Sequence, residues 1–386
     1  MTAAPDRILT THVGSLPRDK AVTDLVFGRE QGQAIDEAEF DRVIGAAVAE
    51  VVAKQVEAGI DLVSDGEQSK ISYATYIKDR ISGFEGDSPR IPPKDLEAFP
   101  RFLERQAKGG GTPSYRRPMN VAETRPMTLE PLHQDVAHLQ KALATAKVEG
   151  AFMNAPSPGI ISLFQPTSHY ATQDEYLEAL AEAMRPEYEA VVAAGLFLQL
   201  DSPDLGLGRH TLYKDRDESE YLSLAERHVE VINHALRNVP ADRVRMHLCW
   251  GNYEGPHHCD VEMEALLPIV LKAKPRNLLF ETSNPRHQHD WAAFVENRDA
   301  IPDDLILVPG VIDTTTNFIE HPKVVAQRIE TFANIVGRER VMAGTDCGFS
   351  TFAGFGAVDP DIVWAKLRTL SEGAAIASER LWRKAA

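Results

Sequence analysis

The feature that most constrains the fold is a unit that recurs along the whole chain. Each unit has a short apolar run, polar residues where the run ends, and then a helical segment. Strands alternating with helices predict a parallel sheet, and eight units favour a closed (β/α)8 barrel over an open, doubly wound sheet. The runs lie at 8–15, 60–67, 151–156, 196–203, 244–249, 277–283, 305–313 and 340–347, and the helical segments include 37–58, 173–194, 218–237 and 324–336.

One segment, residues 83–125, departs from the repeat and is rich in proline, glycine and charge. It is either a solvated surface excursion or a mobile lid whose Arg116 and Arg117 meet an anionic substrate. Residues 118–122 predict an additional strand outside the barrel. With this inserted region, 386 residues fit one α/β barrel domain over 1–386.

The charge balance limits the classes of partner. The net charge is −16, which argues against nucleic acid and anionic membrane as partners. The sequence has no apolar run of about 18 residues, the length of a membrane span, and no signal-peptide pattern at its start. Three cysteines are few for a secreted protein. We therefore expect a cytoplasmic protein that acts on small molecules.

A metal site is indicated by polar residues at the ends of three runs. His247 and Cys249 are two apart on a predicted strand, so their side chains point the same way. Glu281 and Cys347 end two other runs, and all four are residue types that bind zinc. Because the carboxyl ends of barrel strands meet at one face, these residues would converge there.

A structural interpretation of the same residues remains open. Buried free cysteines are common, so His247 and Cys249 could be core residues while Glu281 caps a helix. The nearby residues 257–260 include two histidines, Cys259 and an aspartate, but adjacent side chains on extended backbone point apart and chelate poorly. Cys259 is therefore interpreted as a residue without a metal role.

The chemistry that a zinc site with two thiolates favours is activation of a substrate thiol. A thiol bound to a metal loses its proton near neutral pH, and the thiolate is the nucleophile. Attack on an electrophilic carbon follows. A hydrolase would instead need an open water position and a general base, for which Asp201 or Glu67 is available.

At these residues the sequence resembles the cobalamin-independent methionine synthase family, in its catalytic C-terminal barrel. The shared motifs are His-x-Cys, Glu-Thr-Ser and Asp-Cys-Gly, in that order. The resemblance implies a uroporphyrinogen-decarboxylase-like barrel and a zinc ion bound by His247, Cys249, Glu281 and Cys347. It also implies that homocysteine is bound by Val13, Gly14, Ser15, Glu67 and Asp201.

Three positions depart from the family pattern. The Asp-Glu-Pro motif reads Asp201-Ser202-Pro203, and Thr315 stands where the family has a histidine thought to protonate the folate. Phe164 lies near the position of the tryptophan that stacks on the pterin. Threonine cannot deliver a proton at neutral pH. These departures weaken methyltetrahydrofolate as the methyl donor and leave a folate, a corrinoid carrier or an epoxide as candidates.

The single-barrel relatives suggest two kinds of reaction. In epoxyalkane:coenzyme M transferases a thiolate opens an epoxide, and His12, Tyr73 or Tyr76 could protonate the alkoxide. A sulfonate thiol would require arginines such as Arg116 and Arg117, whereas Glu67 and Asp201 favour an amino-acid thiol. We expect S-methyl transfer to homocysteine or a similar thiol, with epoxide opening second. A metal-dependent hydrolase or a structural zinc site is the alternative from another class.

Overall fold

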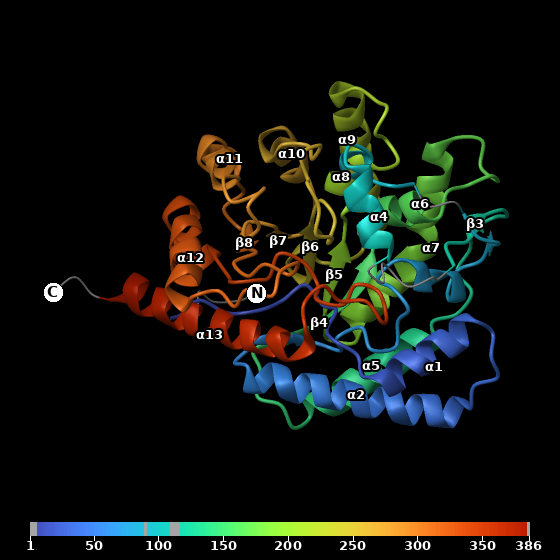
Figure 1. Ribbon diagram of the computed structural model, residues 1–386, viewed down its shortest axis with the longest axis horizontal. Coiled ribbons are helices and arrows are strands. Elements are labelled where there is room, and N and C mark those ends of the chain that lie inside the picture. The colour runs from blue at the N-terminus through green and yellow to red at the C-terminus, as the bar shows by residue number, and fades with distance from the viewer. Residues whose placement is uncertain (1–5, 89–90, 109–115, 384–386) are drawn as a thin grey trace.

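The computed structural model describes residues 6–88, 91–108 and 116–383. Its main sheet has six parallel strands in the order β1-β4-β5-β6-β7-β8. These strands are β1 (Leu62–Ser64), β4 (Gly150–Pro156), β5 (Phe197–Asp201), β6 (Val244–Leu248), β7 (Asn277–Phe280) and β8 (Ile306–Pro309). Figure 1 shows the strands in the centre of the molecule with the helices arranged around them.

Two further segments close the sheet into a barrel. Leu62 N–H donates to the carbonyl of Thr10 (3.0 Å), and Thr11 N–H donates to the carbonyl of Ala343 (2.9 Å). Met342 N–H in turn donates to the carbonyl of Leu307 in β8 (3.0 Å). The predicted (β/α)8 barrel is therefore confirmed.

The first and last of the eight predicted strands pair through isolated bridges rather than as extended strands. One cause is visible at Thr10. Its backbone N–H donates to the carboxylate of Asp61 (2.8 Å) rather than to a neighbouring strand. A side chain thus takes the place of one ladder acceptor, which shortens the regular pairing.

Long helices cover the outside of the barrel, and the four predicted helical segments correspond to α2, α7, α9 and α12 within a few residues. Side-chain caps fix several starts: Asp36 accepts from the first turn of α2, and Thr172 and Glu175 form a capping box on α7. The long helices are α1 (Lys20–Glu30), α2 (Glu37–Glu57), α5 (Glu130–Leu143), α7 (Gln173–Ala193), α9 (Glu218–Ala235), α12 (Pro322–Val336) and α13 (Pro360–Trp382).

Shorter helices lie in the connections between the strands. The short α-helices are α6 (Pro158–Phe164), α8 (Asp204–Leu207), α10 (Met263–Val270) and α11 (Trp291–Glu296). The 3-10 helices are η1 (Thr75–Asp79), η2 (Gly208–His210), η3 (Ala241–Arg243), η4 (Arg298–Ala300) and η5 (Arg338–Arg340). Within the described residues, no helix has the length and apolar character needed to cross a membrane.

Alternation along the strands separates two cores. On β6, Val244, Met246 and Leu248 pack in the large core between sheet and helices, while Arg245 and His247 lie on the other face. A smaller apolar cluster fills the barrel interior. It consists of Val13, Leu62, Phe152, Phe197, Leu279, Val308 and Met342. Apolar packing thus closes the interior below the polar residues at the strand ends.

The inserted region forms a small unit beside the barrel. Its strands β2 (Phe84–Glu85) and β3 (Met119–Asn120) pair antiparallel, so the additional strand predicted at 118–122 is present. Between them lie helices α3 (Lys94–Glu97) and α4 (Pro100–Lys108). Two parts of the segment 83–125, residues 89–90 and 109–115, are outside the described residues.

Candidate metal centre and substrate cavity

A cavity of about 290 Å³ opens at the carboxyl end of the barrel strands. This is the end at which barrel enzymes place their active sites. Its lining includes His247, Cys249, Cys347, Glu67 and Asp201, which come from four different strand ends. The cavity therefore brings together the metal-binding and acidic residues that were predicted from separate motifs.

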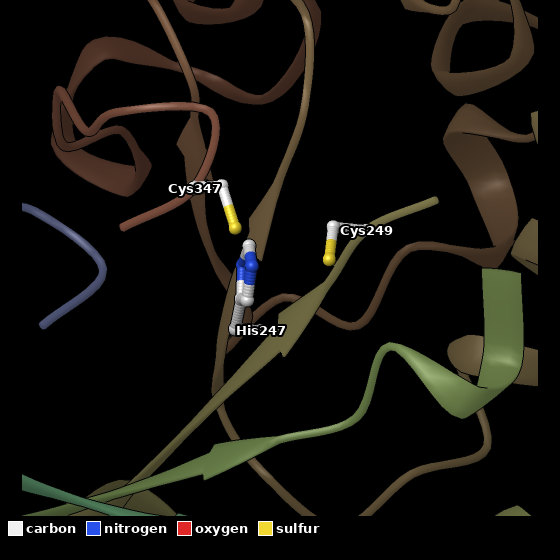
Figure 2. Close-up of side chains that lie close together, drawn as sticks. All are labelled: His247, Cys249 and Cys347. Atoms are coloured by element: carbon white, nitrogen blue, oxygen red, sulfur yellow. The ribbon is translucent and has the colours of Figure 1, made fainter. Parts of the chain in front are cut away.

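Three residues form a compact group of ligand atoms within this cavity. One nitrogen of His247 and the sulfurs of Cys249 and Cys347 all lie within 4.8 Å of one another (Figure 2). Because His247 and Cys249 are two apart at the end of β6, both side chains reach this point from one strand. Cys347 arrives from the segment that closes the barrel.

The environment of His247 suits a metal ligand. Its side chain is buried, and neither ring nitrogen has a hydrogen-bond partner among the described residues. Burial and the charge of Arg245 lower its pKa to about 3, so the imidazole is neutral. A buried, neutral, unpartnered imidazole beside two thiols matches the donor set that zinc prefers. The residues present thus fit the metal that the family resemblance implies.

Glu281 lies at the end of β7, outside this three-residue group. Its carboxylate accepts hydrogen bonds from the backbone N–H of Trp250 (3.1 Å) and from the side-chain amide of Asn284 (2.7 Å). Burial raises its pKa well above the ordinary value, and the neighbouring Cys249 side chain raises it further. Glu281 is therefore close to the thiols but bonded to protein groups in this arrangement.

Glu67 carries the most unusual backbone and electrostatics in the cavity. Its φ is +56°, and His257 is the one other described non-glycine residue with a positive φ. Such strain is typical of functional sites. Burial raises its pKa to about 8 despite the nearby charge of Lys70. Its Oε2 atom is buried and has no hydrogen-bond partner in the part of the chain that is described.

Asp201 stands at the end of β5 and shares this acidic character. Burial raises its pKa to about 6, while hydrogen bonds from Asn154 and Gln199 oppose the shift. The charge of Asp201 in turn contributes to the raised pKa of Glu67. Two carboxylates thus face one cavity with one unpartnered oxygen, an arrangement that favours a cationic ligand group.

The segment Val13–Gly14–Ser15 contributes to the same cavity through Val13 and Ser15. Gly14 has a φ of +136°, which favours glycine, and a Cβ there would lie 2.3 Å from Oδ1 of Asn154. The turn is therefore packed directly against Asn154 of β4.

His12 is placed differently from the proton donor that was predicted. Its Nε2 is bonded to Gln55 (2.7 Å), and its Nδ1 accepts from Gly14 N–H (3.1 Å). Burial lowers its pKa to about 4, and the described lining of the cavity does not include it. Nδ1 binds the turn and Nε2 binds Gln55 of α2, so both ring nitrogens have partners within the protein and His12 supports Gly14.

The inserted region forms a roof over the cavity, since Ile91, Pro93 and Leu96 belong to its lining. Arg117 also lines the cavity, and its guanidinium lies 4.5 Å from the ring centroid of Phe164. Arg116 does not: it lines a second cavity and is 3.9 Å from the carboxylate of Glu30. The two arginines therefore line different cavities, although the sequence suggests that both meet one anionic substrate.

Tyr73 and Tyr76, the two tyrosines expected as proton donors, also lie in different places. Tyr73 lines the cavity, whereas the hydroxyl of Tyr76 is buried and donates to Glu187 (2.6 Å). Thr315 caps its own turn by bonding to Asp313.

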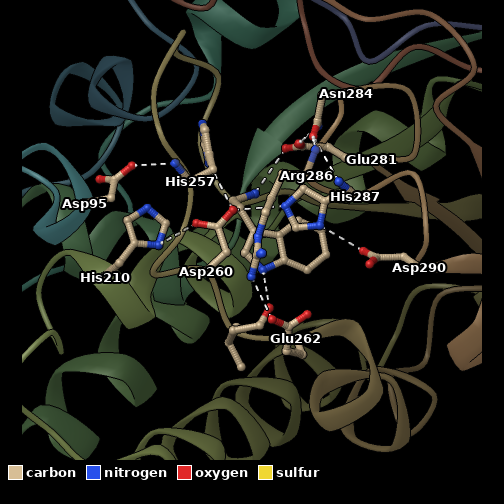
Figure 3. A network of polar contacts seen from close by, with 12 residues as sticks. Asp95, His210, His257, Asp260, Glu262, Glu281, Asn284, Arg286, His287 and Asp290 are labelled. Atoms are coloured by element: carbon tan, nitrogen blue, oxygen red, sulfur yellow. Dashed lines mark hydrogen bonds and ion pairs between the residues drawn. The ribbon is translucent and has the colours of Figure 1, made fainter. Parts of the chain in front are cut away.

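A buried network around Asp260 was missed by the sequence analysis, which treated residues 257–260 only as a poor chelate. Its carboxylate contacts His257 (3.0 Å), His287 (3.0 Å) and His210 (3.2 Å) (Figure 3). Asp95 of α3 joins the network by accepting from the backbone N–H of His257 (2.9 Å). The three histidines follow different strands, so no local spacing could reveal them.

This network supports the loop that follows Cys249. The Trp250 ring stacks on His287 with centroids 4.0 Å apart, and Trp250 N–H is the group that binds Glu281. The network thereby links the roof helix α3 to the loops beside the metal centre.

Known proteins resemble this chain over most of its length. The Bacillus subtilis (strain 168) uncharacterized protein YxjH is 26% identical over 368 residues, 92% of this chain and 91% of its own. A methionine synthase of Saccharolobus solfataricus is 24% identical over 381 residues, 97% and 96% of the two chains. A B12-independent methionine synthase from Shewanella sp. W3-18-1, solved in complex with selenomethionine, shares the fold. Its TM-score is 0.73 at 18% identity, with 97% and 99% of the chains covered.

The family model described as cobalamin-independent synthase, catalytic domain, matches residues 8–89 and 159–359. These ranges contain Glu67, Asp201 and the three clustered ligands His247, Cys249 and Cys347. The chain therefore belongs to the cobalamin-independent methionine synthase family.

Proposed function

We propose that this protein transfers a methyl group to the thiol of an amino acid, with homocysteine as the best fit, at a zinc ion. His247, Cys249 and Cys347 would bind the zinc, with Glu281 as the expected fourth ligand. The observation that carries the proposal is the unpartnered carboxylate oxygen of Glu67 in the same cavity as two thiols and a neutral imidazole.

In this proposal, one set of residues in the cavity binds the amino-acid end of the substrate and another set binds the zinc that activates its thiol. Glu67 and Asp201 would bind the ammonium group of the amino acid, because paired carboxylates stabilise a buried cation. Ser15, which lines the cavity beside them, would contact the carboxylate end. When bound, zinc lowers the pKa of a coordinated thiol so that it is a thiolate at neutral pH. The acidic pair then fixes the direction in which the substrate sulfur points.

The relatives named methionine synthase support this assignment. The donor is proposed only as a class: a folate or a corrinoid carrier for methyl transfer, or an epoxide for the alkyl-transfer alternative. Thr315 is bonded to Asp313 and supplies no proton at neutral pH. A donor whose leaving group needs no protonation from that position therefore fits best.

Alkyl transfer to a thiol that carries a sulfonate group, such as coenzyme M, has less support. A sulfonate would meet the carboxylates of Glu67 and Asp201, and like charges repel in a buried site. Arg116, one of the two arginines that could have compensated, lines another cavity. Epoxide opening by coenzyme M thus remains the weaker alternative.

X-ray absorption at the zinc edge tests the proposal. The zinc-loaded protein is measured alone, with L-homocysteine and with coenzyme M. We expect one additional sulfur neighbour with L-homocysteine only. Coordination that stays the same with both thiols would contradict the proposal, and a change with coenzyme M alone would favour the alternative.

A further inference from the structure

Two amide side chains lie directly below the acidic residue that ends β5. Asn154 of β4 and Gln199 of β5 are register partners on neighbouring parallel strands. Gln199 and Asp201 are two apart on β5 and point to the same face. Asn154, Gln199 and Asp201 are all buried. The amides therefore occupy the interior layer beneath the cavity floor.

Both amides link the same two groups, the carboxylate of Asp201 and the carbonyl of Val13. The Nδ2 of Asn154 donates to Oδ2 of Asp201 (2.9 Å) and to the carbonyl of Val13 (2.8 Å). The Nε2 of Gln199 donates to Oδ1 of Asp201 (2.8 Å) and also to the carbonyl of Val13. Each amide nitrogen has two hydrogens, so each bridges the turn before Gly14 to one oxygen of the carboxylate.

The arrangement fixes the orientation of the carboxylate without cancelling its charge. A guanidinium in the same place would also orient Asp201 but would neutralise it. Amide donors are neutral, so the negative charge of Asp201 stays available to a ligand. The amides cannot rotate by half a turn, because their oxygens would then face the carboxylate and carbonyl oxygens.

The side-chain oxygens of both amides are buried and have no hydrogen-bond partner among the described residues. Unpartnered buried oxygens are costly. The close approach of Asn154 to Gly14 adds a second constraint. An ordinary core position would favour an apolar residue here. The hydrogen bonds that the two amide nitrogens donate to Asp201 and to the Val13 carbonyl therefore account for the presence of the amides.

We infer that Asn154 and Gln199 are positioning residues for the amino-acid substrate, an inference that rests on the proposed function. They hold Asp201 and the Val13–Ser15 turn at a fixed separation, so that the ammonium and carboxylate groups of one ligand meet both at once. Their role concerns binding of the amino-acid end and not the metal.

The test measures binding to the zinc-loaded protein by calorimetry with two ligands, L-homocysteine and 4-mercaptobutanoate, which lacks only the amino group. Asn154→Ala and Gln199→Ala should each weaken L-homocysteine binding about tenfold or more, the effect of losing a hydrogen bond to a charged group. Binding of 4-mercaptobutanoate should change by less than about twofold.

Asn277→Ala is the matched control. Asn277 is the register partner of Arg245 in the same interior layer, but its amide donates to the carbonyl of Val244. Its removal should leave L-homocysteine affinity unchanged. Gln199→Met, which keeps the length of the side chain but has no N–H, replaces Gln199→Ala if that variant fails to fold, and Asn154→Leu replaces Asn154→Ala in the same way.

A double-mutant cycle with Asp201→Asn separates positioning from general structure. In the Asp201→Asn background, Asn154→Ala should have little further effect, because the carboxylate it orients is gone. Additive losses, or equal losses for both ligands, would overturn the inference. If the wild-type protein binds neither thiol, the proposed function fails first; if it binds L-homocysteine and the amide variants bind it equally well, only the positioning role fails.

Discussion

The sulfur atoms of Cys249 and Cys347 lie within 4.8 Å of each other, although Cys249 follows β6 and Cys347 follows the segment that closes the barrel. The thiol of Cys249 is hydrogen-bonded to that of Cys347, which together with burial raises its pKa well above the usual value. Two buried sulfur atoms and a neutral imidazole gain a common partner when a divalent cation binds between them.

Replacing one of these ligands should remove the metal. In Cys347→Ala we expect zinc, measured by atomic emission after dialysis, to fall well below one equivalent. Thiol methylation should drop by more than about 100-fold, the upper end of the loss caused by removing a ligand's supporting partner. Cys259→Ala is the control, because Cys259 is partly exposed and outside the group. Full zinc in Cys347→Ala would refute the assignment.

Glu67 should make substrate binding depend on pH. Its pKa is raised to about 8 in the free protein, so at pH 7 it is largely protonated and must lose the proton to pair with an ammonium. Affinity for L-homocysteine should therefore fall as pH decreases from 8 to 6. Glu67→Gln should remove the part of this slope near pH 8 and leave the part near pH 6 that belongs to Asp201. It should also raise KM about tenfold at pH 8, the effect of losing a charged hydrogen bond. An unchanged slope in Glu67→Gln would assign the titration to another group.

The same shift has a consequence for stability in the absence of substrate. The folded pKa of Glu67 lies above its unfolded value, so the folded state binds more protons between about pH 4.5 and 8, and stability falls as pH rises through that window. Glu67→Gln should raise the Tm of the substrate-free protein at pH 8 by roughly a few degrees. Thermal unfolding followed by circular dichroism measures this difference, and a lower Tm would contradict it.

Gly14→Ala should disrupt the turn beneath the substrate. The added Cβ would meet Oδ1 of Asn154 at 2.3 Å, and the backbone has a φ of +136°. Gly32→Ala is the control for backbone strain alone, since Gly32 has a φ of +72° and nothing within 4 Å of the added Cβ. We expect Gly32→Ala to cost about 1 kcal/mol, and Gly14→Ala to cost more and to weaken L-homocysteine binding. If urea unfolding shows the same loss of stability for both variants, the contact of the added Cβ with Asn154 does not contribute to the loss.

Asp260 should stabilise the loops beside the metal centre in a pH-dependent way. Burial would lower the pKa of His287, but hydrogen bonds to Asp260 and Asp290 outweigh it and raise the pKa to about 10. This stabilisation is complete below the unfolded histidine pKa and is lost as pH rises from about 6.5 to 10. In Asp260→Asn, urea unfolding should show lower stability at pH 6 and a weaker decline toward pH 9. An identical decline would show that His287 is held by Asp290 alone.

The strand pattern was the most reliable part of the sequence prediction, because alternation is dictated by the two cores on either side of the barrel wall. His247 and Cys249 point the same way for that reason. His12 is expected with Glu67 and Asp201 because all three stand at the carboxyl ends of strands, but its imidazole is bonded to Gln55 and to the N–H of Gly14, and it is absent from the described lining of the cavity. Arg116 and Arg117 are adjacent, so an extended backbone sends their side chains to different cavities.

The partners of a side chain across the barrel could not be predicted. Asn154 and Gln199 show no local motif, and their joint contact with Asp201 depends on the register between β4 and β5. The histidines around Asp260 likewise follow separate strands. Spacing along one strand determines the face on which a side chain lies, while the register between strands determines which side chains it contacts.

The roof of the cavity comes from a segment that takes no part in the barrel sheet. Ile91, Pro93 and Leu96 cover the cavity, whereas His247, Asp201 and Glu67 are fixed by the strand ends. Asp95 attaches this roof to the loop after β6 through Tyr253 and His257. Substitutions at Ile91, Pro93 or Leu96 would therefore reshape one wall of the cavity without moving the residues at the strand ends, so under the proposed function the roof could change the donor that fits while the site for the thiol stays the same.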